Sequence, residues 1–191
     1  RTLVTEIGEQ VYLFPLFTAE FCARLLEEAE RQPGWLTVLE PTEARHSAPQ
    51  AGFADVIDVI EPDTTLSFEE MPGACELYAE VIRHHVAPIL EGLWTTFRLQ
   101  KWDVPAVRRY EPHVVSRMRL HYDAETVGMV GYLNSGFTGG GTHFPRWGLT
   151  VGDSEHVQPG SVIVYPGGVS HEHLAHAVTA GRRYTLANSF Y

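Results

Sequence analysis

Apolar residues recur at helical spacing in two stretches of the first half of the chain. Thr18 is expected to cap a helix that runs to about Gln32, where a Pro-Gly pair ends the pattern. A second helix is expected over about 74–92, with Pro88 either kinking or splitting it. The expected apolar faces are Phe21, Leu25, Leu26 and Ala29 in the first helix, and Leu77, Val81, Ile82, Val86, Ile89 and Leu90 in the second.

Short runs of β type dominate the second half. An opening strand is already expected over 9–17, and the alternation over 55–60 predicts another. The later runs, separated by Gly- and Pro-rich turns, are 104–110, 115–122, 126–134, 148–151, 161–165 and 183–190. Helices followed by many short strands predict an α+β, mainly β fold. We expect a double-stranded β-helix, or jelly roll, with the N-terminal helices packed on one sheet.

Composition is compatible with one globular domain over residues 1–191. We expect 1–95 to form a helical and strand support region and 96–191 to form the jelly-roll core with the metal site. The contents of 44% hydrophobic and 20% charged residues are ordinary for such a domain. The net charge of -10 argues against general binding to nucleic acid or to an anionic membrane.

The chain contains no run that approaches the roughly 18 apolar residues of a membrane span. It also shows no targeting segment, so a cytoplasmic location is the expectation. Because the chain begins at Arg1, a trimmed targeting segment is the alternative.

His121 and Asp123 form the most informative pair in the sequence. They end a strand-like run, where residues i and i+2 point to one face and can hold the same metal ion. The same alternation places Met118 and Leu120 on the opposite face. Two histidines with one carboxylate leave three coordination positions open, the arrangement typical of non-haem Fe(II) oxygenases. A His-x-Asp spacing also arises by chance at strand ends, so the interpretation depends on the second histidine.

Three histidines compete for that second position: His171, His173 and His176. Spacing alone does not separate His171 from His173, because both share a strand face. His173 is favoured because a ligand there places Arg183 on the next strand, where a guanidinium can reach into the barrel beside the metal.

Arg183 shares its expected strand face with Thr185, Ala187 and Ser189. A guanidinium can hold a carboxylate through two parallel hydrogen bonds, and a neighbouring hydroxyl adds one further donor. Arg183 with Thr185 therefore suits the far carboxylate of a 2-oxoglutarate cosubstrate. The alternative for Arg183 is an ion pair on the surface.

The chain resembles the catalytic domain of procollagen lysyl hydroxylases, within the prolyl and lysyl hydroxylase group of Fe(II)/2-oxoglutarate dioxygenases. The resemblance runs nearly from end to end. The segments that carry it are VYLFPLFTAEFCARLLEEAE, ADVIDV, VAPILEGLW, VRRYEP, HYDAETVGMVGYLN, GGGTHFPRW, PGSVIVYPGGVSHEH and AGRRYTLANSFY. The pattern of triad and arginine is specific to the superfamily, and the match to the lysyl branch is looser.

This resemblance implies that His121, Asp123 and His173 bind iron and that Arg183 anchors the C5 carboxylate of 2-oxoglutarate. Tyr110 matches a tyrosine that contacts the cosubstrate in the lysyl branch, although an ordinary core aromatic is the alternative.

The chain also departs from that branch at two places. Val130 stands where the branch carries a polar cosubstrate contact. The amino-acid sequence around His173 also differs from that branch. Both departures bear on the substrate more than on the chemistry.

The resemblance further implies an enzyme that uses Fe(II), 2-oxoglutarate and O2, with ascorbate as reductant, to hydroxylate an unactivated C–H bond. A lysine residue or lysine-like unit is the first expectation for the substrate, with Asp103, Glu111 and Glu125 as candidate partners for its ammonium group. The alternatives are hydroxylation of prolyl residues, or of a free amino acid or small metabolite. A non-enzymatic, cupin-like metal-binding module is the alternative of another class. A homodimer is expected from the relatives.

Overall fold

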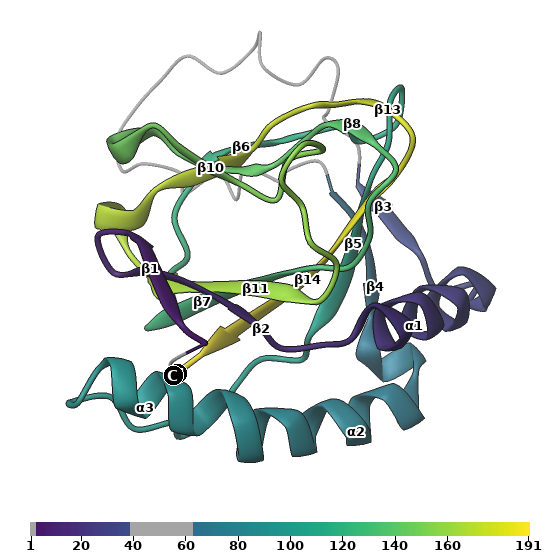
Figure 1. Ribbon diagram of the computed structural model, residues 1–191. Coiled ribbons are helices and arrows are strands. Elements are labelled where there is room, and N and C mark those ends of the chain that lie inside the picture. Colours follow the sequence, from purple (N-terminus) through teal and green to yellow (C-terminus); the bar gives the residue numbers. More distant parts are fainter. Residues whose placement is uncertain (1–2, 39–62) are drawn as a thin grey trace, which may run out of the picture.

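The computed structural model describes residues 3–38 and 63–191 of the chain. Two antiparallel sheets face each other, and the helices cover the outer face of the larger one, as Figure 1 shows. The prediction of a mainly β jelly roll with helices packed on one sheet is therefore confirmed.

The larger sheet has eight strands and contributes one wall of the barrel. Its strands, in spatial order, are β1 (Thr5–Gly8), β2 (Val11–Pro15), β11 (Ser161–Pro166), β7 (Val127–Tyr132), β14 (Arg183–Phe190), β5 (Ala106–Tyr110), β4 (Asp63–Ser67) and β3 (Leu36–Val38). Strands from both ends of the chain thus meet in this sheet.

The smaller sheet has four strands and forms the opposite wall. Its spatial order is β10 (Leu149–Val151), β9 (Thr142–Phe144), β12 (His173–Ala175) and β6 (Met118–His121). The strands β8 (Thr138–Gly139) and β13 (Val178–Ala180) form a separate two-stranded antiparallel ribbon.

Helix α1 (Ala19–Arg31) has the bounds that the sequence predicts. The side chain of Thr18 accepts a hydrogen bond from the backbone N–H of Phe21, at 3.1 Å, and Gln32 ends the helix. This bond satisfies one of the N–H groups that the first turn of a helix leaves unpaired. The buried face consists of Cys22, Leu25 and Ala29.

The second predicted helix is a continuous helical run with a wide turn in its middle. It consists of α2 (Pro72–Val81), the π-helical turn η2 (Ile82–Val86) and α3 (Ala87–Leu93). The N–H of Ala87 bonds to the carbonyl of Ile82, five residues back. Proline has no N–H and clashes with the carbonyl four residues before it, so a wide turn just ahead of Pro88 accommodates the ring without breaking the helix.

Several strand predictions differ from the structure in detail. The opening strand predicted over 9–17 corresponds to β2 (Val11–Pro15), and β1 (Thr5–Gly8) precedes the predicted range. Gln10, in the turn between the two strands, has a positive φ of 56°. The strand predicted over 55–60 lies outside the described residues. Short strands that the sequence did not predict are β3, β4, β8, β9, β12 and β13, most of which are too short for a period of two to show.

The main core lies between the larger sheet and the helices. Because side chains alternate along a strand, each central strand of that sheet sends one set of residues to the helices and the other set into the barrel. In β14, Leu186 and Phe190 pack in the main core, whereas Arg183 and Thr185 line the cavity. The predicted shared face of Arg183, Thr185, Ala187 and Ser189 is confirmed.

Among the described residues, no helix is long and apolar enough to cross a membrane.

The contribution of the Thr18 cap to the stability of the domain can be tested by mutation. Thr18→Ala should lower the free energy of unfolding by about 1 kcal/mol, because the N–H of Phe21 loses its partner. Thr18→Ser keeps the hydroxyl and serves as the control. Denaturant unfolding followed by circular dichroism measures both, and an equal loss in the two variants would contradict the role of the cap.

Candidate metal centre

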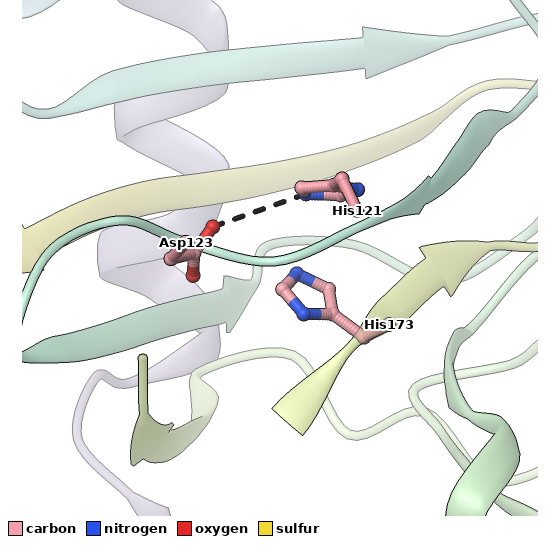
Figure 2. Close-up of side chains that lie close together, drawn as sticks. All are labelled: His121, Asp123 and His173. Atoms are coloured by element: carbon pink, nitrogen blue, oxygen red, sulfur yellow. Dashed lines mark ion pairs between the residues drawn. The ribbon is translucent and has the colours of Figure 1, made fainter. Parts of the chain in front are cut away.

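Three side chains from two neighbouring strands and a loop meet between the sheets. His121 ends β6, Asp123 follows in the loop that leads to β7, and His173 begins β12. The strands β6 and β12 are antiparallel and pair His121 directly with His173, whose ring centroids lie 4.4 Å apart. One potential ligand atom of each of the three residues lies within 4.8 Å of the others, and Figure 2 shows both imidazoles and the carboxylate converging.

A bulge in the pairing of β6 with β12 decides which side chains join the site. His173 pairs with His121 and Ala175 with Met118. The segment between these pairs is therefore one residue longer in β6 than in β12. The extra residue turns Met118 to the same cavity as His121. The prediction that Met118 and Leu120 share the face opposite His121 is therefore wrong for Met118, while Leu120 is half exposed.

Backbone carbonyls orient both imidazoles. Nδ1 of His121 lies 2.8 Å from the carbonyl oxygen of Arg119, and Nδ1 of His173 lies 3.0 Å from that of His171. A carbonyl only accepts, so each Nδ1 carries the proton and each Nε2 offers its lone pair. Metal-binding histidines are commonly fixed by a hydrogen bond of this kind.

The electrostatics of His173 favour the neutral ring. Burial lowers its pKa to about 4, with further lowering by His121 and Arg108, while Asp123 acts in the opposite direction. An imidazole must be neutral to bind a metal ion, so His173 is in the competent form at neutral pH.

Arg183 lies on the same cavity, at the start of β14, and its side chain is 2% exposed. Its guanidinium carbon lies 5.2 Å from the centre of the Tyr110 ring and 5.7 Å from that of Tyr132, and its Nη2 donates to the hydroxyl of Thr142 at 3.3 Å. The buried Nε has no hydrogen-bond partner, and no carboxylate in the described part of the chain pairs with this cation. Burial excludes the surface ion pair considered from the sequence.

An unpaired donor on a buried guanidinium fits an anionic ligand, because a buried charge without a partner is unfavourable. Burial lowers the pKa of Arg183, because removal from water disfavours the charged form of the guanidinium. Tyr110 and Thr185 line the cavity beside it. Tyr110 also packs with Val115 and Phe137 in a small apolar cluster, so the aromatic serves both the core and the cavity wall.

No family model matches the chain. Among curated proteins it is similar to procollagen-lysine,2-oxoglutarate 5-dioxygenase 1 of Gallus gallus, with 29% identity over 184 residues, 94% of this chain and 23% of that protein. The multifunctional procollagen lysine hydroxylase and glycosyltransferase LH3 of Rattus norvegicus is 27% identical over 192 residues, 97% of this chain and 24% of that protein. The chain thus spans about a quarter of the length of these relatives.

Solved structures show the same architecture. The viral collagen prolyl hydroxylase of Paramecium Bursaria Chlorella virus-1, in a 2OG complex, has a TM-score of 0.67 at 16% identity and covers 96% of both chains. A Pseudomonas putida prolyl-4-hydroxylase has a TM-score of 0.64 at 17% identity, covering 96% of this chain and 93% of the other.

A prolyl hydroxylase from Trichoplax adhaerens was solved with a hypoxia inducible factor peptide fragment. It has a TM-score of 0.63 at 12% identity, covering 96% of this chain and 84% of the other.

The chain is lysyl/prolyl hydroxylase-like and has the fold of the 2-oxoglutarate oxygenases. In this hydroxylase-like domain, two functional candidates escaped the sequence analysis: Tyr165 and Gly128. The hydroxyl of Tyr165 lies 3.1 Å from Nε2 of His173. Burial and the charge of Asp123 raise its pKa well above the ordinary value, so the phenol stays neutral. Because Nε2 of His173 is the atom offered to the metal, the phenol contributes to the site through its hydrogen bond with the carboxylate of Asp123.

Gly128 makes the close approach of these groups possible. A Cβ built on it would collide with the carboxylate of Asp123 and lie 2.7 Å from a ring carbon of Tyr165. Neither contact is visible in the sequence, where Gly128 is one glycine in a β-strand pattern.

The two other histidines that the sequence offered as the second ligand, His171 and His176, lie outside the triad. His171 is buried, and its Nε2 lies 3.0 Å from the carbonyl oxygen of Glu9. His176 is exposed and stacks near His143, with ring centroids 4.7 Å apart. Val130 lines the cavity, so the position that departs from the lysyl branch does face the site.

The three acidic residues considered as partners for a lysine ammonium group do not line this cavity. Glu111 forms ion pairs with Arg109 and Arg182, at 3.4 Å and 2.9 Å. Asp103 and Glu125 both accept from the hydroxyl of Tyr191. That part of the sequence interpretation is wrong, because all three already have partners elsewhere.

Gly128→Ala tests the packing of the triad. The added methyl group should displace Asp123 or Tyr165 and weaken metal binding by about tenfold or more, since second-sphere changes commonly have effects of that size. Gly92→Ala is the control, because a Cβ there meets nothing within 4 Å. Titration with Co(II), followed by its visible absorption, measures the affinity. Unchanged affinity in Gly128→Ala would contradict the contact.

Proposed function

We propose that this domain is an Fe(II)- and 2-oxoglutarate-dependent hydroxylase of an amino-acid unit, presented in a peptide. The observation that carries the proposal is the joint placement, in one cavity, of a two-histidine, one-carboxylate cluster and a buried arginine with an unpaired donor. A metal-binding module of another class has no use for that arginine.

The triad residues would hold the ferrous ion from one side. His121 and His173 offer their Nε2 lone pairs and Asp123 offers a carboxylate oxygen. Three protein ligands leave room at the metal for a bidentate cosubstrate and for O2. When bound, iron and 2-oxoglutarate supply the oxidising chemistry, with decarboxylation of the cosubstrate to succinate.

The residues around Arg183 would orient the cosubstrate. The guanidinium would bind its far carboxylate, and Thr185 and Tyr110 stand beside it in the cavity wall. Arg183 itself is held by Thr142 and by the faces of Tyr110 and Tyr132. This support fixes a long side chain in one place before the ligand arrives.

The remaining cavity wall is partly apolar. Its apolar members include Met118, Val130, Leu174 and Ala175, and its polar members include Arg108, Asn188 and Ser189. Such a wall leaves the substrate to be positioned by shape and by a small number of polar contacts.

A peptide substrate is supported by the relatives. The names of the curated relatives describe hydroxylation of procollagen lysine, and one structural neighbour was solved with a bound peptide. The hydroxylated product shows whether the target is a lysyl or a prolyl residue. Mass spectrometry of peptides containing one or the other, incubated with the domain, identifies the residue that gains one oxygen.

The triad gives the first test of this function. The intact domain with Fe(II), 2-oxoglutarate and ascorbate should form succinate, and His121→Ala should abolish both metal binding and turnover, because two of three ligands do not hold the ion. Chromatographic measurement of succinate and Co(II) titration check the two effects. Leu120→Ala, at the neighbouring exposed position of β6, is the control. Iron-independent turnover would refute the proposal.

Arg183→Met tests the cosubstrate role separately. Loss of a charged hydrogen-bonded pair should raise the KM for 2-oxoglutarate by about 10- to 100-fold, while Co(II) affinity stays close to that of the parent protein. Arg182→Met, one residue earlier and exposed on the surface, is the control. Equal loss of metal binding in Arg183→Met would show that the residue supports the fold of the site rather than the cosubstrate.

A further inference from the structure

The smaller sheet carries a second pair of neighbouring histidines outside the candidate metal centre. His143 lies in the middle of β9, and His176 directly follows β12. Their ring centroids lie 4.7 Å apart, close to the 4.4 Å between the two imidazoles of the triad. His143 and His176, called here the outer histidine pair, have no part in the proposed hydroxylase chemistry.

The register of the smaller sheet brings these two side chains together. His143 pairs with Leu174, and the backbone N–H of His176 donates to the carbonyl of Gly141 at 2.9 Å. The two histidines are therefore diagonal neighbours on adjacent segments, with their side chains on one face of the sheet. Backbone hydrogen bonds hold both segments in this register, so the proximity of the rings does not depend on a contact between them.

The outer histidine pair faces away from the cavity. The residues on either side of His143 point inward: Thr142 accepts a hydrogen bond from Arg183, and the ring of Phe144 lies 5.5 Å from that of His173. Because side chains alternate along a strand, His143 points to the opposite face, where it is half-buried and its partner is exposed. The two segments that carry the pair thus support the arginine and one triad histidine from behind.

His143 has the orientation and the protonation state of a metal ligand. Its Nδ1 lies 2.9 Å from the hydroxyl oxygen of Thr150 on β10, which leaves Nε2 for a ligand. Burial lowers the pKa of His143 and His176 lowers it further, while the carbonyl of Leu149 acts in the opposite direction. The ring is therefore neutral at neutral pH, the form that binds a metal ion.

The separation of the rings fits two ligands of one ion. A metal bound to an imidazole nitrogen at about 2.0–2.1 Å lies about 3.2 Å from the ring centre, so two rings at an angle of about 90–110° have centroids about 4.5–5.2 Å apart. The observed 4.7 Å falls in this range. Among the described residues, no third histidine, cysteine or carboxylate joins the pair, so water would complete the coordination.

We propose that the outer histidine pair is a second metal site, which takes a borderline divalent ion such as Cu(II) or Zn(II) and clamps β9 to the segment after β12. Imidazole suits these ions, whereas Fe(II) stands low in the affinity order of the divalent metals. The bound ion would stabilise the folded chain, because the register that brings the two rings together exists only in the folded state. The inference is independent of the hydroxylase function, since neither histidine belongs to the triad.

The test needs a domain in which the triad does not compete for the ion. His121→Ala combined with Asp123→Ala leaves one imidazole of the triad and serves as the background variant. Cu(II) is the probe, because it heads the affinity order. Isothermal titration calorimetry should show one equivalent at the tightest site, and electron paramagnetic resonance should show two nitrogen ligands.

Removal of either imidazole should break the site. In the background variant, His176→Ala and His143→Ala should each lower the affinity for Cu(II) by about tenfold or more, at least the effect of losing an outer-sphere partner. Each should also reduce the resonance pattern to one nitrogen. The exposed position of His176 makes its replacement compatible with the fold, which circular dichroism verifies. His156→Ala is the control, because His156 is exposed and pairs with Asp153 at 2.9 Å.

The clamp has a readout of its own in thermal unfolding. Zn(II) should raise the unfolding midpoint of the background variant and of its His156→Ala derivative, because the ion binds the folded chain. The same concentration should leave the midpoint of the His176→Ala derivative unchanged.

Three outcomes would overturn the inference. These are unchanged Cu(II) affinity after His176→Ala, an equal loss of affinity after His156→Ala, and a resonance pattern with a single nitrogen in the background variant. None of them bears on succinate formation by the parent domain, so the second metal site and the hydroxylase function are tested separately.

Discussion

The antiparallel pairing of β6 with β12 is the constraint on which the candidate metal centre depends. It sets His121 opposite His173, and a shift of one residue would turn one imidazole to the outer face of the small sheet. The loop with Asp123 is fixed by backbone bonds as well: the carbonyl of Asp123 accepts from the N–H of Gly168 at 2.7 Å, and that of Thr126 from Gly167 at 2.9 Å. Backbone hydrogen bonds, rather than contacts among the ligands, hold the triad together.

The central strands of the larger sheet contribute side chains both to the main core and to the candidate metal centre. In β11, Val162 and Val164 belong to the core under the helices, while Tyr165 reaches the triad on the other face. In β7, Gly128 leaves room for Asp123 and Tyr165, and Met129 packs in the main core. Burial of the apolar face of each strand fixes its register, and this register places the residues of the other face at the metal site.

The sequence predicted what depends on local patterns. The N-cap at Thr18 and the apolar period of α1 are local, and so is the alternation along β14 that places Arg183 beside Thr185. The spacing of His121 and Asp123 and the order of the later segments were enough to single out the three residues that the structure brings together.

The remaining features depend on contacts between distant segments. The bulge that turns Met118 inward arises from the pairing of β6 with β12 and has no mark in either segment alone. Tyr165 and Gly128 acquire their roles only when β11 and β7 lie side by side. Strands of two or three residues, such as β8 and β12, are too short to show a hydrophobic period. The π-helical turn before Pro88 relieves the steric clash of the proline ring, but a helix can also relieve that clash by kinking or ending, so the sequence does not predict which occurs.

The burial of Arg183 also links the folding equilibrium of the domain to its surroundings. In the chain by itself this guanidinium has given up water and has gained hydroxyl and aromatic neighbours, which compensate a full charge only in part. Any small dicarboxylate that completes the pairing binds the folded chain and not the unfolded one, so mass action raises resistance to heat and proteolysis as that metabolite accumulates. Through the buried Arg183, binding of such an acid would be coupled to the stability of the folded domain.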